Sequence, residues 1–100
     1  MIYITQLIYI QEGQEEVFHA FEDVAIPLIA KYGGKLLLRL RPTAEEIIES
    51  AMEPPYEVHF VQFEAEEDLN RFMKDEERKK FLHLKEQSIR MSVLIKGQSF

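Results

Sequence analysis

The chain has 100 residues and a mass of 11.8 kDa, and 46% of its residues are hydrophobic. This is the size of one domain and too apolar for a disordered chain, so we expect a single folded domain over residues 1–100. The formal charge of −6 disfavours DNA and anionic membrane surfaces as partners. The absence of cysteine excludes disulfides and thiolate metal sites, and no apolar run reaches the length of a membrane span. We therefore expect a cytoplasmic protein.

The first half of the chain is predicted to form a strand, a helix and a second strand. Residues 2–10 alternate in polarity and are rich in β-branched and aromatic side chains, which indicates a strand. Residues 15–32 begin with two glutamates and repeat apolar side chains at helical spacing, which indicates a helix with one buried face. The glycine pair 33–34 is typical of a helix stop, and residues 35–41 form the second strand.

The second half is predicted to contain a connector, a third strand, a helical segment and a last strand. The connector, residues 42–55, begins with a motif that resembles a capping box and predicts one or two short helical turns. Residues 56–64 read as the third strand. Helical spacing then covers residues 66–84, with a new start at residues 75–76, and residues 89–95 form the last strand.

This βαββαβ order predicts an α+β, ferredoxin-like fold, in which a four-stranded antiparallel sheet carries its helices on one face. Strict alternation of the strand side chains assigns each residue to one of the two sheet faces. The helix-facing side is predicted to carry Ile2, Ile4, Ile8, Leu36, Leu38, Leu40, Val61, Phe63, Ile89, Met91, Val93 and Ile95. The opposite, open face is predicted to carry Tyr3, Thr5, Leu7, Tyr9, Leu37, Arg39, Arg41, Val58, Phe60, Gln62, Arg90, Ser92 and Leu94. Because so large an apolar face is not expected to stay in water, we expect a second copy of the chain to cover it.

The stretch from Val24 to Arg39, in which a helix containing Pro27 ends in Tyr32-Gly33-Gly34 and leads into a strand, resembles the dimeric α/β-barrel superfamily. Phe63 to Leu69 and the later Asp75-Glu76-Glu77 resemble the second half of the same pattern. The resemblance is strongest to small stand-alone domains of unknown function related to antibiotic-biosynthesis-type monooxygenases. It implies that two copies pair their sheets face to face as a dimeric α/β barrel. It also implies a small-molecule role, for which a cofactor-free monooxygenase or isomerase is one expectation.

A polar pair interrupts the otherwise apolar helix-facing side of the predicted sheet. His59 on the third strand and Gln6 on the first strand fall on this side, which suggests a small pocket between the sheet and the helices. A neutral buried imidazole can act as a base near neutral pH, so His59 is the candidate catalytic residue and Gln6 and His59 are candidate ligand-binding residues. The competing interpretation is a core histidine that is satisfied by a backbone or glutamine partner.

Two further candidates for ligand binding are Arg39, for a carboxylate, and Tyr32, for an aromatic substrate. Such arginines are more often interface groups paired with an acid, here Glu57 or Glu64. His19 is placed opposite the apolar face of its helix and is expected to be solvated. The sequence shows no nucleophile elbow, phosphate loop or metal-ligand spacing, so no cofactor and no metal are expected.

Three function classes compete at this stage. The first is a homodimeric domain that binds a small apolar or aromatic molecule, with or without catalysis, and the second is a non-enzymatic dimerisation or scaffold protein. The third is an RNA-recognition-like domain, in which Tyr3 and Phe60 would stack on bases. The net charge of −6 and the residues that replace the basic and glycine positions of the third-strand motif disfavour this last class.

Overall fold

A computed structural model describes residues 1–98 and confirms the α+β, ferredoxin-like fold. The elements are β1 (Ile2–Ile10), α1 (Glu15–Lys31), β2 (Lys35–Leu40), the 3₁₀ turn η1 (Ala44–Glu46), β3 (Glu57–Phe63), α2 (Glu66–Met73), α3 (Glu76–Lys80), α4 (Leu82–Ser88) and β4 (Ile89–Gln98). The four strands form one antiparallel sheet in the order β2-β3-β1-β4. Among the described residues, no helix is long and apolar enough to cross a membrane.

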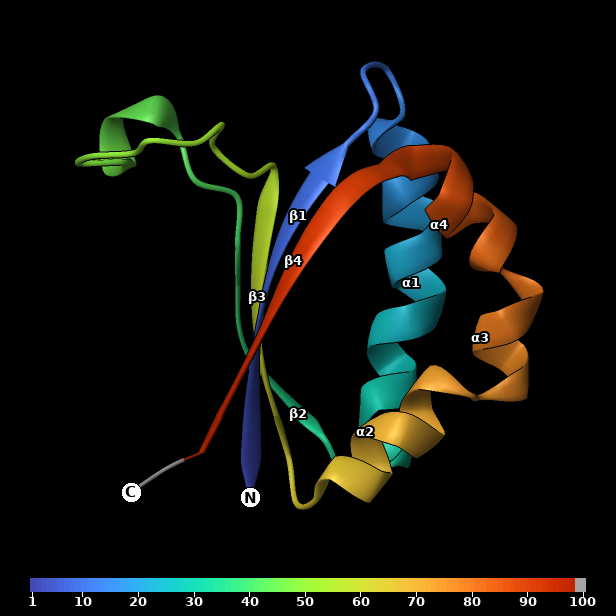
Figure 1. The fold of residues 1–100 in the computed structure, drawn as a ribbon. Helices are drawn as coiled ribbons and strands as arrows, with labels where there is room; N and C mark the ends of the chain where they lie inside the picture. The colour runs from blue at the N-terminus through green and yellow to red at the C-terminus, as the bar shows by residue number, and fades with distance from the viewer. Residues whose placement is uncertain (99–100) are drawn as a thin grey trace.

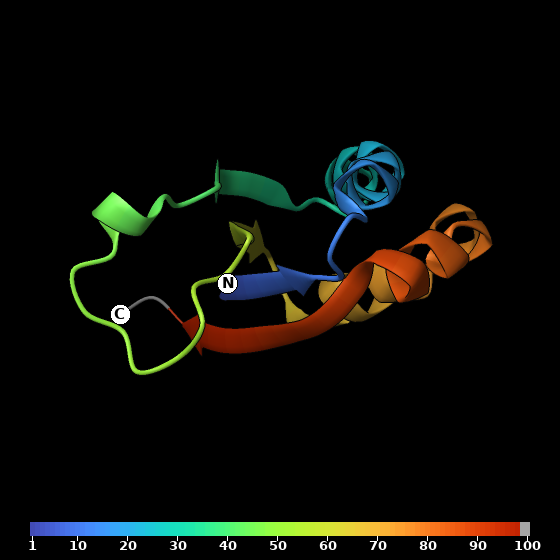
Figure 2. The ribbon, with the colours of Figure 1, turned by 90° about the horizontal axis from the view of Figure 1, so that it is seen from above.

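The molecule consists of a sheet layer, a helix layer and the connector, residues 42–55, which projects from the sheet (Figure 1). Figure 1 shows α1 to α4 together on one side of the sheet, and the connector 42–55 on the other side. Figure 2, seen from above, places the connector and the helices on opposite sides of the strands as well. The core between the layers centres on Ile4, Ile29, Val61 and Phe63. The sheet therefore has one face covered by helices and one face that only the connector approaches.

The glycine pair after α1 fixes how closely the helix approaches the sheet. Gly33 has a φ of +74°, which is the left-handed conformation expected at a helix stop. Gly34 is buried, and a Cβ atom at this position would lie 2.6 Å from the ring of Phe63 and 2.7 Å from Ile29. The first glycine is thus required by backbone conformation and the second by packing.

A β-bulge in β2 overturns part of the predicted face assignment. Leu36 pairs with Val61 but Leu38 pairs with Phe60, so β2 advances two residues where β3 advances one. The extra residue reverses the alternation. Leu38 and Leu40, predicted to face the helices, share the open face with their partners on β3, whereas Arg39 pairs with His59 and lies on the helix-facing side.

A second bulge reverses the alternation in β4. Ile89 pairs with Ile10 and Met91 pairs with Tyr9, so Arg90 is the extra residue. The prediction that Met91, Val93 and Ile95 face the helices was wrong, because these residues pair with open-face residues of β1. Ser92 and Leu94, which were predicted on the open face, pair with Ile8 and Gln6 and face the helices.

After this correction the open face is more apolar than predicted. Only three polar side chains, Thr5, Lys35 and Gln62, remain among the paired residues of this face in the described chain. The full set is Tyr3, Thr5, Leu7, Tyr9, Lys35, Leu38, Leu40, Val58, Phe60, Gln62, Met91, Val93, Ile95 and Gly97. The case for something covering this face is therefore stronger in the structure than in the sequence.

Candidate functional site

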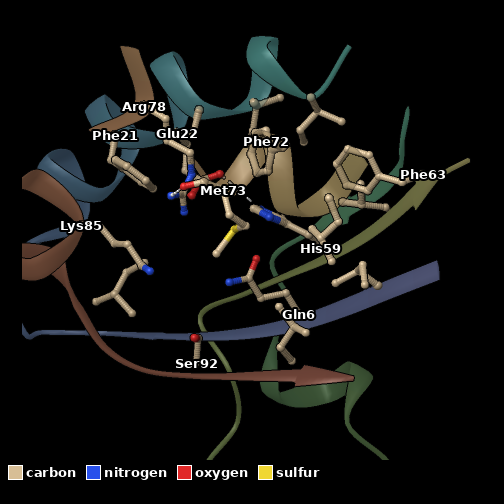
Figure 3. Close-up of a pocket in the computed structure, with 18 residues that line it drawn as sticks. Gln6, Phe21, Glu22, His59, Phe63, Phe72, Met73, Arg78, Lys85 and Ser92 are labelled. Atoms are coloured by element: carbon tan, nitrogen blue, oxygen red, sulfur yellow. Dashed lines mark hydrogen bonds and ion pairs between the residues drawn. The ribbon is translucent and has the colours of Figure 1, made fainter. Parts of the chain in front are cut away.

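A cavity of about 130 Å³ lies between the helix-facing side of the sheet and the helices (Figure 3). Eighteen residues line it, and most of them are apolar. The six polar lining residues are Gln6, Glu22, His59, Arg78, Lys85 and Ser92. Cavities of about 150 Å³ bind molecules the size of benzene, so this one has room for a single ring. An apolar cavity with a few converging polar groups is the usual form of a small-molecule site.

Gln6 and His59 occupy the positions that the sequence predicted. They are direct cross-strand partners on β1 and β3, and both line the cavity. His59 is 4% exposed, whereas Gln6 is half-buried. In Figure 3 the Gln6 amide and the His59 ring point into the same hollow. The predicted pocket between sheet and helices is present, and the binding role of these two residues stays a prediction.

Glu57 holds His59 and anchors two arginines. It is fully buried and accepts hydrogen bonds from Arg39 Nε at 3.1 Å and from Arg41 Nε at 2.8 Å. Its Oε2 also pairs with His59 Nε2. Burial acts to raise the pKa of Glu57, but the bonds from His59, Arg41 and Arg39 outweigh it and lower this pKa to about 2. Since an ionised carboxylate only accepts, Nε2 of His59 carries the hydrogen in this pair.

Glu22 is the residue that sequence reasoning missed. It projects from α1 into the cavity wall, is 5% exposed, and places Oε2 at 3.6 Å from His59 Nε2. Burial raises the pKa of Glu22 to about 7; His59 opposes this rise and the charge on Glu57 adds to it. The signal was present in the sequence, because Glu22 follows Phe18 by four residues and precedes Ala25 by three, and so shares the apolar face of α1.

Two cations complete the polar part of the cavity wall. Arg78, at 7% exposure, is held between the rings of Phe21 and Phe72, with its guanidinium carbon 5.7 Å and 5.3 Å from their centres. Lys85 reaches the cavity from α4 and points into it in Figure 3. Burial lowers the pKa of both side chains, and the charge on Arg78 lowers that of Lys85 further.

The other two predicted residues, Tyr32 and Arg39, do not line the cavity. The hydroxyl of Tyr32 donates to Asp75 Oδ2 at 2.5 Å, beside a bond from Lys31 at 2.9 Å. Arg39 is bonded to Glu57, which confirms the predicted pairing of an arginine with this acid.

The prediction of a solvated His19 was wrong. The ring is half-buried, and its Nε2 lies 2.7 Å from the hydroxyl of Tyr56, against which it stacks. This partner, Tyr56, directly precedes β3, so the helical pattern of α1 does not reveal it.

The structure also brings together three side chains with metal-ligand chemistry. One ligand atom each from Glu22, Glu57 and His59 lies within 4.8 Å of the other two. However, Arg41 occupies one oxygen of Glu57, and Arg39 and His59 occupy the other. Because two guanidinium groups already neutralise Glu57, we interpret the cluster as a hydrogen-bonded acid–base group.

Fold and cavity together define a ferredoxin-like α+β protein, and comparison with known proteins agrees at that level. No protein-family model matches the sequence, and a search of curated proteins finds no significant match. The chain is similar in structure to a protein of unknown function from Rhodopseudomonas palustris, with a TM-score of 0.82, 14% identity, and coverage of 99% of this chain and 82% of that one.

Two further solved structures carry the same fold. An uncharacterised NIPSNAP domain protein from Burkholderia xenovorans gives a TM-score of 0.72 at 11% identity and covers 100% of this chain and 95% of that one. A dimeric protein of unknown function and ferredoxin-like fold from Bacteroides fragilis gives 0.71 at 10% identity, with 98% and 95% coverage. At these identities the likeness shows the fold, and the site must be argued from its own chemistry.

Proposed function

We propose that this chain is a homodimeric domain that binds a small, largely apolar or aromatic molecule in the cavity and exchanges a proton with it without a cofactor. The observation that carries the proposal is the buried pair of Glu22 and His59, 3.6 Å apart in the wall of a ring-sized cavity. The domain is proposed to span residues 1–100 and to act in the cytoplasm, as the composition predicts.

Glu22 suits the role of general acid or base. A pKa of about 7 lets the carboxyl take up or release a proton at neutral pH, which is the condition for efficient acid–base catalysis. We assign His59 a positioning role and not that of the base. Its Nε2 hydrogen is directed to the ionised Glu57, so this nitrogen does not accept a proton from a substrate. Gln6, across the strand pair from His59, adds an amide that can donate to a substrate oxygen. Abstraction of a proton next to a carbonyl is therefore the reaction class that the cavity supports best, as in an isomerase.

The open sheet face supports the homodimer. Apolar side chains dominate this face, and a symmetric partner would bury it against an identical surface. The connector stands off on the same side of the sheet, and its Ile48 is fully exposed while Met52 is 49% exposed. A second copy placed on the sheet would lie beside these side chains. The structurally similar Bacteroides fragilis protein is itself described as dimeric.

Proton transfer is tested with a ring-sized carbon acid. We would follow exchange of the α-hydrogens of 2-indanone with deuterated water by proton NMR, with wild-type protein, Glu22→Gln and the control Asp23→Asn. Asp23 is the exposed neighbour of Glu22 on α1, so its substitution should leave the rate unchanged. We expect Glu22→Gln to lower the protein-dependent rate by about 100-fold. Equal rates in wild type and Glu22→Gln would overturn the acid–base role.

Dimerisation is tested by light scattering on the same samples. A mass of two chains is expected, and Phe60→Lys on the open face should reduce it to one. A wild-type monomer would contradict the pairing and would leave Tyr3 and Phe60, which stack with ring centres 5.5 Å apart, free on the open face. Binding of single-stranded RNA would then be the next function to measure.

A further inference from the structure

We infer that the natural ligand of the cavity carries a carboxylate, which Arg78 and Lys85 bind at the α3–α4 side of the cavity while the ligand's apolar body fills the rest. This inference rests on the proposed binding function and names the chemical class of the ligand. The inference rests on Arg78 and Lys85, two cations that have no carboxylate partner within residues 1–98. Neither cation takes part in the acid–base role of Glu22.

Arg78 is a buried cation with an unused donor. More than nine-tenths of the residue is buried, and its Nε has no hydrogen-bond partner among the described residues. The guanidinium makes one long bond, from NH1 to the carbonyl of Met73 at 3.3 Å. Asp75 accepts from the backbone N–H of Arg78 at 2.9 Å and not from its side chain. Leaving a buried charged donor unpaired is costly, and such groups are normally satisfied.

No acid within the described chain compensates this charge at close range. Neither Glu22 nor Asp75 has an oxygen within 4.0 Å of a guanidinium nitrogen of Arg78, although both attract it from farther away. The two phenyl rings that hold the guanidinium fix its position, so little ordering is lost when it binds an anion. A planar guanidinium is the side chain best matched to a carboxylate.

Lys85 places a second positive charge at the same side of the cavity. Residues 1–98 contain no carboxylate within ion-pair distance of its amine, and Arg78 is close enough for its charge to lower the pKa of Lys85. Two like charges that face one hollow repel each other, and an anion between them relieves this repulsion. Figure 3 shows the Arg78 guanidinium and the Lys85 amine directed at the same hollow as the Ser92 hydroxyl and the Gln6 amide.

The local charge of the cavity is opposite to that of the whole protein. The titratable groups in its wall are Glu22, His59, Arg78 and Lys85, and with Glu22 half-protonated near neutral pH the balance is positive. The chain as a whole carries −6. The size and apolar lining then limit the ligand to a ring-sized body with one anionic end.

The test compares benzoate with its neutral isostere benzamide, by calorimetry and by NMR of the arginine Nε–H signals. We expect benzoate to bind wild-type protein about tenfold or more tightly than benzamide and to shift the Arg78 Nε–H resonance. Lys85→Met should remove most of this preference. Arg78→Met should do the same if it folds, and Lys85→Met keeps the test open if it does not. The matched controls are Arg71→Met and Lys79→Met, whose exposed side chains do not line the cavity.

The outcomes distinguish failure of the carboxylate inference from failure of the proposed ligand-binding function. Equal affinity for benzoate and benzamide would overturn the carboxylate inference while leaving the cavity as a binding site. A preference for benzoate that survives Lys85→Met and moves no Arg78 signal would also overturn it, because the anion would then bind elsewhere. Failure of both probes to bind would overturn the ligand-binding function together with the inference.

Discussion

The protonation of Glu22 makes folding stability depend on pH in a direction opposite to that of most carboxylates. Burial raises the pKa of this group from 4.5 to about 7. Between these two values the unfolded chain has lost the proton that the folded chain keeps. Stability contributed by Glu22 is therefore fully present below about pH 4.5 and is lost as the pH rises through about 7. Each pKa unit is worth about 1.36 kcal/mol, so the full loss is about 3 kcal/mol.

Glu22→Gln isolates this effect, because glutamine has nearly the same shape and does not titrate. We would measure urea unfolding of both proteins at one concentration between about pH 5 and about pH 8. The free energy of unfolding of Glu22→Gln minus that of wild type should rise across this window, by up to about 3 kcal/mol. The low pKa of Glu57 does not interfere, since its contribution is lost only as the pH falls from about 4.5 towards about 2. A difference that does not change with pH would show that Glu22 titrates normally and refute the reasoning.

Three further predictions follow from single contacts. Gly34→Ala should lower the free energy of unfolding in a urea titration by about 1–3 kcal/mol, because its Cβ would lie 2.6 Å from Phe63, and an unchanged midpoint would contradict this. Glu57→Gln should lower stability by about 1–3 kcal/mol, since it leaves two arginines without their carboxylate, and an unchanged urea midpoint would contradict this. Phe60→Lys should give a folded monomer by light scattering and circular dichroism, while Phe60→Leu should stay dimeric, and a dimeric Phe60→Lys would exclude the open face as the interface.

The fold was predictable from the sequence because each element carries its own local signal. The strands alternate, α1 repeats apolar residues at helical spacing, and the glycines after it stop the helix, as the φ of +74° at Gly33 confirms. The order of the elements then leaves few topologies, and the observed sheet order is the ferredoxin-like one. Nothing beyond local pattern was needed for this level of description.

The assignment of faces failed at two bulges, for a reason that local pattern does not reveal. Ile89, Met91, Val93 and Ile95 alternate as a regular strand would, and nothing in this run marks Arg90 as an extra residue. The register is set by pairing with β1, which is distant in the sequence. In β2 three consecutive leucines hide the same kind of shift, because an apolar run has no polar residue to mark its face.

The candidate site was half-predictable for a related reason. Gln6 and His59 were found because a polar residue on an apolar strand face is a visible exception. Glu22 is the same kind of exception on a helix face. Its helical spacing in the sequence from Phe18 and Ala25 was the signal that could have identified it. Arg78 gives no such signal, since a basic residue in Glu-Glu-Arg-Lys-Lys reads as an ordinary exposed helix.

The chemistry of the cavity depends on how two glutamates are treated differently by one fold. Glu57 lies at the start of β3, where Arg39 and Arg41 reach it, and is held ionised. Glu22 faces the apolar cavity, where residues 1–98 place no lysine or arginine nitrogen within 4.0 Å of its carboxyl, and burial raises its pKa to about 7. Two carboxyls with pKa values pushed apart by their surroundings are the arrangement from which acid and base roles arise. The β2 bulge contributes to it, because the extra residue at Leu37 places Arg39 on the helix-facing side, where its Nε donates to Glu57.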